Sequence, residues 1–465
     1  MKKQFIYLIS IGILNLLLFT GVFKCLQHDK IYHHTLGVIS ENYERVGGWD
    51  NYEIKKTSRP YLQIKNDNFE TWDAGIYKCI SERMYRSEYD CYGHVRSAFF
   101  PLFPLLWKIT HCTPIGISVI NYFLFILSVA FLVMFLLKTT LSDKLVTYTL
   151  LIALPSAVIY YMPYTEALFL FTMTIAAIGL LKKKYWMFFA GSLLMSMVRP
   201  ATVFILIAVV LAELVIFIKN KNYRSLIKEI IFKSLPFFIG YFCALFIQYL
   251  SSGSWTAFIE AQKYWTGGVQ VVKGISDWSI EGFGLSSFAI FFVCLPAMLF
   301  TLFLLVNRSK TTKDYILKIK DYNSGYLFLI SIFYLTGILG FTLLTSGGNL
   351  HSFSRFILAS PLFFIAVLIF LDYLSGKPLK LIVLFFFTLT FLLVLFLNIV
   401  DYGGGRMQFS FFGLYMFIVI SLFLIIKKTI SLPAQIMITL ALVMLVTIWN
   451  TFLLNIFLSN GWIFT

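Results

Sequence analysis

The sequence predicts an all-α polytopic membrane protein that forms a single membrane domain over residues 1–465. Of the 465 residues, 59% are hydrophobic and 13% are charged, and the mean hydropathy is +0.82. Soluble domains carry roughly 25% charged residues, so most of this chain must lie in lipid. Apolar runs of about 20 residues recur along the whole length, and each is long enough to cross a bilayer as a helix. The alternating ten-residue segments of a membrane barrel are missing from the sequence.

The apolar runs predict about thirteen transmembrane helices. The first follows Lys2 and Lys3; it is longer than the core of a signal peptide and has no small-x-small cleavage site, so we expect it to be retained. The predicted spans cover residues 5–26, 115–137, 145–162, 165–181, 186–198, 201–218, 230–250, 285–306, 325–345, 356–374, 379–399, 409–426 and 434–457.

The distribution of basic residues predicts the orientation of these spans. Alternating sides from an inner amino terminus places twenty Lys and Arg residues on inner segments: Lys2, Lys3, Lys138, Lys144, Lys182, Lys183, Lys184, Lys219, Lys221, Arg224, Lys228, Arg308, Lys310, Lys313, Lys318, Lys320, Lys377, Lys380, Lys427 and Lys428. The short outer loops carry five: Arg199, Lys263, Lys273, Arg355 and Arg406. Short cytoplasmic loops are enriched in Lys and Arg, so the carboxyl terminus is predicted outside. The same rule accounts for the net charge of +16 without a nucleic-acid partner.

Two long polar segments are predicted on the outer side, residues 28–97 after the first helix and residues 251–284. The first is rich in tyrosine, and the second contains Trp255, Trp265 and Trp278. Such aromatic residues commonly anchor a protein at the membrane interface, and aromatic faces also stack on sugar rings. The predicted inner loops contain no Gly-rich phosphate-binding loop, which argues against an ATP-driven machine. Chemistry is therefore expected on the outer face.

The stretch ETWDAGIYKCISERMY at residues 70–85 predicts a helix that lies in the membrane interface. Four apolar side chains recur at every fourth position and are expected to face the membrane: Trp72, Ile76, Ile80 and Met84. Three charged side chains with i,i+4 spacing lie opposite: Lys78, Glu82 and Arg86. Thr71 is predicted as the N-cap, which puts Asp73 in the first turn, where the helix dipole favours an acid by about 0.3–1 kcal/mol. Asp73 therefore either stabilises a helix start or takes part in chemistry.

Five motifs, in this order along the chain, resemble the PIG-V family, whose members add the second mannose of GPI anchors and have bacterial relatives. The motifs are WDAGIY at 72–77, FFPLFP at 99–104, YTEALF at 164–169, MVRP at 197–200 and SFSRFILASP at 352–361. The resemblance implies a GT-C glycosyltransferase, with a long outer loop after the first helix that carries interfacial helices. Such an enzyme takes mannose or another hexose from a polyprenyl-phosphate carrier, and an acid in the first outer loop serves as the base.

The implied reaction is an inverting single displacement onto a lipid-linked or cell-surface glycan at the outer face of a bacterial cytoplasmic membrane. A carboxylate must take the proton of the acceptor hydroxyl, and the resemblance gives this role to Asp73. Cations must stabilise the departing phosphate, and the candidates are Arg199, Arg355 and His351. Sugar- or acceptor-binding candidates are Trp72, Tyr77, Tyr164, Glu166 and Trp265. Glu166 can equally be a helix-start acid beside a Thr cap. The partners are then the lipid-linked donor, the glycan acceptor and membrane lipids.

Other features leave alternatives open. Cys79 and Cys91 lie on the predicted outer side and are candidates for a disulfide. No Cys/His spacing matches a zinc site, so neither a metal nor another cofactor is expected. A flippase or transporter of lipid-linked saccharides is a second functional class, although internal repeats are not visible. An O-antigen-type polymerase is a third, although its large outer loop usually falls late in the chain.

Overall fold

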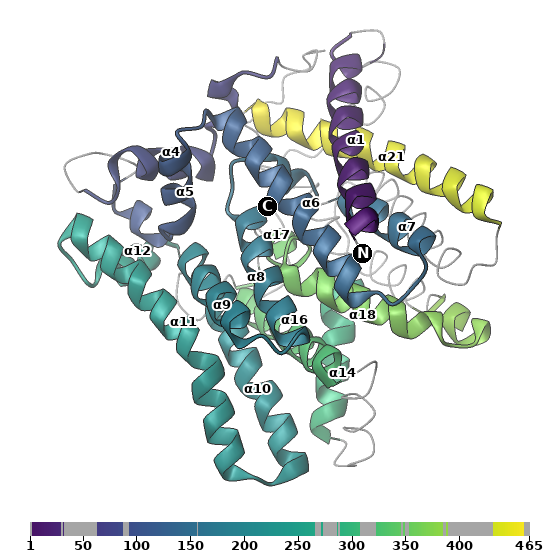
Figure 1. Ribbon diagram of the computed structural model, residues 1–465. Helices are drawn as coiled ribbons and strands as arrows, with labels where there is room; N and C mark the ends of the chain where they lie inside the picture. The colour runs from purple at the N-terminus through teal and green to yellow at the C-terminus, as the bar shows by residue number, and fades with distance from the viewer. Residues whose placement is uncertain are drawn as a thin grey trace.

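The computed structural model describes a helical protein (Figure 1), and every regular element of the described residues is an α-, 3-10 or π-helix. The described residues are 2–28, 31, 63–86, 93–155, 157–265, 271–272, 286, 289–306, 322–345, 347–348, 353–384, 387–388 and 431–459.

Five helices are long and apolar enough to cross a membrane: α1 (Lys2–Leu26), α6 (Pro114–Leu136), α11 (Tyr223–Ser252), α16 (Tyr322–Thr345) and α21 (Leu432–Leu458). At 1.5 Å per residue, each exceeds the roughly 30 Å of a bilayer's hydrocarbon core. Shorter apolar helices account for five more predicted spans: α8 (Glu166–Leu181), α9 (Tyr185–Val198), α10 (Thr202–Asn220), α14 (Leu295–Val306) and α18 (Pro361–Ser375). The predicted class of a multi-pass α-helical membrane protein is therefore confirmed. The count of thirteen spans and the GT-C arrangement stay predictions.

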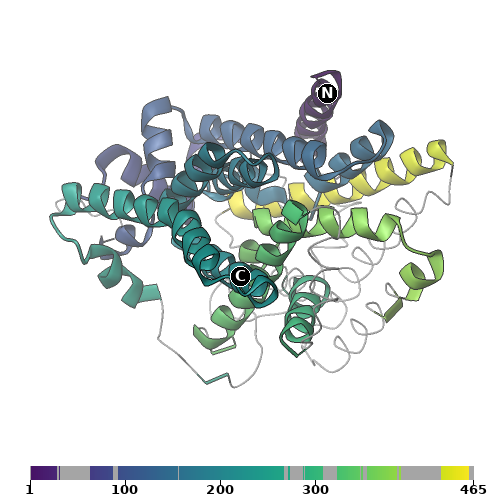
Figure 2. The same ribbon diagram turned by 60° about the horizontal axis from the view of Figure 1, so that its bottom comes forward.

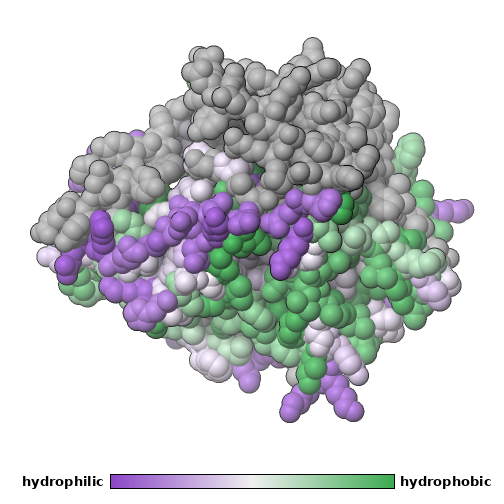
Figure 3. All heavy atoms as spheres, turned by 90° about the horizontal axis from the view of Figure 1, so that it is seen from above, coloured by the Kyte–Doolittle hydropathy of each residue, from purple (hydrophilic) through white to green (hydrophobic). Residues whose placement is uncertain are grey.

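The surface of the described chain agrees with this class. Figure 3 shows hydrophobic residues over a broad part of one face, with hydrophilic residues gathered along its borders. Helices α10 and α11 expose large apolar side chains, among them Ile207, Ile227, Phe238 and Phe242. Contiguous exposed apolar surface of this kind is unfavourable in water and favourable against lipid tails.

Local sequence sets where the long helices begin and end. The hydroxyl of Thr113 accepts the backbone N–H of Gly116 at 3.1 Å, and Pro114 fills the first position of α6. The side chain of Asn222 likewise accepts the N–H of Ser225 at the start of α11. These residues satisfy amides that the first helical turn leaves without partners.

Two predicted spans are broken by proline, which corrects the sequence analysis. The span predicted at 145–162 is a short helix, α7 (Leu141–Ile152), followed by a 3-10 turn, η3 (Ala157–Tyr161). Pro155 lies between them and has no N–H to continue the helix. The span predicted at 356–374 is divided into α17 (Phe353–Ile357) and α18, which begins at Pro361. The predicted spans at 379–399 and 409–426 lie largely or wholly outside the described residues.

The interfacial helix is also corrected. It forms as α4 (Asp73–Arg83), but its apolar side packs on protein rather than on membrane. Ile76 and Ile80 are buried in a cluster with Tyr85, Phe99 and Ile247, the last of these in α11. In both ribbon views α4, α5 (Leu102–Thr110) and α12 (Ala257–Trp265) lie together at one side of the molecule (Figure 1 and Figure 2).

The charged side of α4 differs from the prediction as well. Among the described residues, Lys78 pairs with Glu70 before the helix, at 2.6 Å, and not with Glu82 one turn on. Trp72, expected to anchor the apolar face, is 37% exposed and precedes the helix with a positive φ of 54°.

Close backbone contact fixes the three helices that frame the site. Helix α9 packs on α8 at Gly191, where a Cβ would lie 2.5 Å from the backbone N of Ala176. It packs on α11 at Gly240, where a Cβ would lie 2.4 Å from the carbonyl O of Leu193. Interhelical contact in membranes depends on such small residues, because lipid supplies no hydrophobic force between helices.

The α8–α9 hairpin separates two ends of the bundle. Helix α8 runs about 24 Å from Glu166 to a turn that carries Lys182, Lys183 and Lys184. Helix α9 then returns and brings Arg199 to within 2.9 Å of Glu166. The lysine-rich turn and the Glu166–Arg199 pair therefore lie at opposite ends of the hairpin.

The close α8–α9 contact gives a prediction of stability. Gly191→Ala should lower the melting temperature of the purified protein, because its Cβ meets backbone atoms that cannot move aside, and overpacking typically costs about 1–3 kcal/mol. Gly337→Ala, in α16 where nothing lies within 4 Å of a Cβ, is the matched control and should leave stability unchanged or raised. Equal melting temperatures for the two variants would contradict this packing.

Candidate functional site

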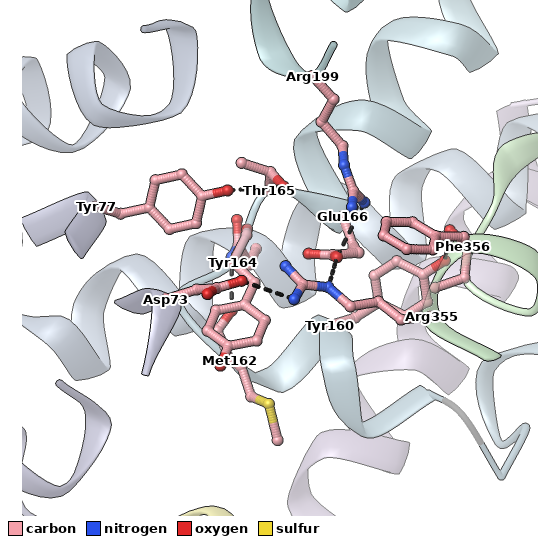
Figure 4. Close-up of polar contacts among 12 residues, drawn as sticks. Asp73, Tyr77, Tyr160, Met162, Tyr164, Thr165, Glu166, Arg199, Arg355 and Phe356 are labelled. Carbon is pink, nitrogen blue, oxygen red and sulfur yellow. Dashed lines mark hydrogen bonds and ion pairs between the residues drawn. The ribbon is translucent and has the colours of Figure 1, made fainter. Parts of the chain in front are cut away.

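Four charged side chains from distant segments meet at one end of the bundle (Figure 4). Nη1 of Arg355 donates to Oδ2 of Asp73 at 2.7 Å, and Nε of Arg355 donates to Oε1 of Glu166. Nη1 of Arg199 donates to the same Oε1 of Glu166 at 2.9 Å. We call these four residues the charged cluster.

Asp73 enters the cluster as the first residue of α4. The residue at the N-cap position is Trp72, which makes no side-chain cap bond, so the predicted Thr71 cap is wrong. The hydroxyl of Thr71 instead donates to the carbonyl of Phe457 in α21, at 3.4 Å. The sharp turn at Trp72 directs Asp73 toward Arg355, and the position of the acid in the first turn is as predicted (Figure 4).

Glu166 is the first residue of α8 and is completely buried. The chain before it is held by Asn121 of α6, whose amide donates to the carbonyls of Met162 at 2.7 Å and Tyr164 at 2.8 Å. Those carbonyls lie in the irregular segment after η3, where no regular helix satisfies them. Buried carbonyls need partners, so Asn121 stabilises the turn that presents Glu166.

The two arginines come from places where the long helices are interrupted. Arg199 follows the last residue of α9 with extended backbone, directly before Pro200. Arg355 lies in the short α17 and is buried. Its guanidinium lies over the ring of Tyr164 at 4.7 Å, and that of Arg199 lies over the ring of Phe356 at 5.4 Å. Such cation–π contacts favour a desolvated guanidinium by about 2 kcal/mol.

Tyr77 closes the side of the cluster toward α4. Its hydroxyl donates to Oγ1 of Thr165 at 3.4 Å, and its ring makes edge contacts with Phe99 and Phe103. Burial raises the pKa of Tyr77 well above its usual range, and the nearby carboxylate of Asp73 adds to this. Tyr77 therefore remains a neutral hydroxyl, and the aromatic–proline run at 99–104 serves to pack its ring.

The cluster is formally neutral, with two carboxylates and two guanidiniums. Side-chain exposure is 0% for Glu166, 6% for Arg355 and 13% for both Asp73 and Arg199. Charges this deep are costly unless they are paired, and removal of one partner from such a pair costs about 3–5 kcal/mol. Ionisable groups that face the interior of a membrane helix bundle most often mark a substrate path or a reaction site.

Most predicted site residues are thus brought together: Asp73, Tyr77, Tyr164, Glu166, Arg199 and Arg355. Trp72 directly precedes Asp73 in the chain, and its side chain is partly exposed. Trp265 ends α12, and its side chain, like His351 as a whole, lies outside the described residues. Sequence analysis missed Asn121, whose signal is an amide inside an apolar span. It expected Thr165 only as a helix cap; Thr165 occupies the N-cap position of α8, but its side chain makes no cap bond.

Two further expectations concern metal and cysteine chemistry. Within the described residues, no three His, Cys, Asp or Glu side chains are grouped to hold a metal ion, and the expectation of a metal-free reaction stays a prediction. Cys79 is disulfide-bonded, whereas Cys25, Cys112, Cys243 and Cys294 are free. The predicted partner of Cys79, Cys91, lies outside the described residues.

Comparisons of this chain with known protein families, with curated proteins and with solved structures find no match. The resemblance to the PIG-V family therefore stays a prediction from the five sequence motifs.

A double-mutant cycle tests whether Asp73 and Arg355 are coupled. Asp73→Asn and Arg355→Gln should each lower stability, and the double variant should lose less than the sum, by about 0.5–3 kcal/mol. The control cycle on the less buried Lys78–Glu70 pair, whose side chains are 31% and 27% exposed, should show at most about 1 kcal/mol. Thermal unfolding in one detergent measures both cycles, and additive losses at Asp73 and Arg355 would refute the contact.

Proposed function

We propose that this protein is a membrane glycosyltransferase that moves a hexose, such as mannose, from a polyprenyl-phosphate carrier to a lipid-linked or cell-surface glycan. The observation that carries the proposal is the charged cluster, in which a carboxylate suited to deprotonate a hydroxyl lies 2.7 Å from an arginine suited to bind phosphate. A cation pair beside an acid, at one end of an apolar bundle, matches what a lipid-linked donor requires.

The proposed reaction uses few groups. The acceptor hydroxyl oxygen attacks the anomeric carbon of the donor sugar, and the bond from that carbon to the phosphate oxygen breaks. The bonding electron pair leaves with the phosphate, and the hydroxyl proton passes to the carboxylate of Asp73. The departing phosphate gains negative charge as the bond breaks, and Arg199 and Arg355 are placed to stabilise that charge.

We further propose that the site faces the outer side of a bacterial cytoplasmic membrane. Supporting this, the Glu166–Arg199 pair and the lysine-rich turn at 182–184 lie at opposite ends of the α8–α9 hairpin, and Lys-rich turns favour the cytoplasm. The disulfide at Cys79 in α4 also fits an oxidising compartment.

A lipid-linked saccharide transporter is the second candidate, favoured by the helix breaks at Pro155 and Pro361. Transporters place substrates at discontinuous helices near charged groups, and the segment that carries Arg355 is discontinuous with α18. The two functions differ in outcome, because a transporter leaves the saccharide chemically unchanged.

Cysteine labelling tests the proposed orientation. In a background where the four free cysteines are serine, a cysteine at position 108 should react with a membrane-impermeant maleimide in intact cells. A cysteine at position 183, in the α8–α9 turn, should react only after the membrane is opened. Both positions carry an exposed lysine, Lys108 in α5 and Lys183 in the α8–α9 turn, so neither is covered by protein. The reverse pattern would place the charged cluster on the cytoplasmic side and overturn the proposal.

Loss of transfer tests the chemistry. Asp73→Asn keeps the shape of the side chain and removes its charge, so turnover should fall by roughly 10²–10⁴, the usual contribution of a general base. Mass analysis of surface glycans, in a deletion strain complemented with each variant, should find one hexose missing with Asp73→Asn. Glu213→Gln is the matched control, because it removes another buried acid, paired with Lys233 at 2.5 Å between α10 and α11. Normal glycans from a well-expressed Asp73→Asn variant would remove Asp73 from the reaction.

A further inference from the structure

The two carboxylates of the charged cluster are not equivalent. Glu166 is completely buried, and one of its oxygens, Oε1, accepts from both arginines. Asp73 is 13% exposed and accepts from Nη1 of Arg355 alone among the contacts of the cluster. Glu166 therefore lies at the inner side of the cluster, and Asp73 lies at its accessible edge.

Glu166 keeps the two cations beside each other. Two guanidiniums repel at close range in a low dielectric, and the shared carboxylate oxygen offsets this repulsion. The rings of Tyr164 and Phe356 lie against the guanidiniums and limit their orientation. Glu166 thus holds a preformed pair of cations whose remaining N–H groups are available to a second anion.

Asp73 occupies the place that a second anion would take. A sugar phosphodiester carries one negative charge, as does the carboxylate of Asp73. Exchanging one for the other keeps the buried cluster neutral, whereas adding the phosphodiester beside Asp73 would leave an uncompensated charge. While Asp73 accepts from Arg355, its Oδ2 is also held against the guanidinium rather than against an acceptor hydroxyl.

We infer that Glu166 is a positioning residue that fixes Arg199 and Arg355 as one anion clamp, and that the donor phosphate displaces Asp73 from this clamp. This inference rests on the proposed function and adds an order to it. The donor binds first, its phosphate takes the Nη1 group of Arg355, and the released carboxylate of Asp73 then accepts the acceptor proton. An acceptor that arrives without donor meets an acid still held by Arg355, so Asp73 is released to act as base only beside a bound sugar.

Binding of a phosphate-bearing lipid tests whether phosphate displaces Asp73 from Arg355 or whether Asp73 acts only as a base. The full-length protein in phosphatidylcholine nanodiscs is titrated with farnesyl phosphate by calorimetry. Asp73→Asn should bind the probe about three- to tenfold more tightly than wild type, since a neutral amide competes less well than a charge for Arg355. Glu166→Gln should bind it about tenfold or more weakly, because the clamp loses its shared anion. Glu213→Gln should bind as wild type does.

Kinetics and rescue test the positioning role. Glu166→Gln should raise the donor KM about tenfold or more, for the same reason as the affinity loss, with the acceptor KM unchanged. Glu166→Asp keeps the charge and should recover part of the loss, which a variant that merely unfolds would not do. If Glu166→Gln proves too unstable to purify, the Asp73→Asn titration still tests the exchange, and the Glu166→Asp kinetics still test the positioning role of Glu166.

The outcomes distinguish the inference from the proposed function. If Asp73→Asn binds the probe no more tightly than wild type does, the proposed exchange is overturned. If that same variant also loses hexose transfer, the proposed glycosyltransferase function still stands. Absence of probe binding to wild type overturns both. Tighter binding by Asp73→Asn with normal transfer would retain the clamp and remove the catalytic role of Asp73.

Discussion

The structure of the site depends on one buried oxygen atom, Oε1 of Glu166. It accepts from two arginines that both follow it in the chain, 33 and 189 residues away. Without that negative charge, Arg199 and Arg355 could not share a water-poor space. The position of the oxygen depends in turn on α8, which is held by the tight contact at Gly191 and by the amide of Asn121 before its first turn. The packing of α8 therefore determines the electrostatics of the site.

The sequence predicts the participants of the site better than their pairing. Glu166 and Arg355 stand out because each is a charge beside a long apolar run, and Asp73 stands out because it opens a helix with an apolar stripe. The local sequence does not predict that Glu166 bridges the two arginines, because the contacts join segments far apart in the chain. Asn121 was missed for a related reason: its partners are backbone carbonyls of the irregular segment before α8, and the exact end of a helix is weakly marked in sequence.

The errors in the predicted fold share a physical cause. An apolar stripe every fourth residue predicts a buried helix face but not what covers it, because lipid tails and protein side chains are equally apolar. The stripe at Ile76 and Ile80 therefore fits both the expected membrane contact and the observed contact with Ile247. Likewise, hydropathy averaged over a window of residues does not register Pro155 or Pro361. It therefore joins segments into one predicted span where the proline interrupts the helix.

The separation of Asp73 from Arg355 by 282 residues also has a consequence for biogenesis. A ribosome adds about 5–20 residues per second, so Asp73 is made roughly 14–56 s before its partner. During that interval the acid has no guanidinium and remains hydrated, while Glu166 and Arg199, only 33 residues apart, can already meet. The cluster is thus completed late in synthesis, and a chain interrupted before α17 would hold two acids and one cation in a half-built membrane domain. Such a chain carries an unpaired charge at the bundle end, a feature that membrane quality control could recognise.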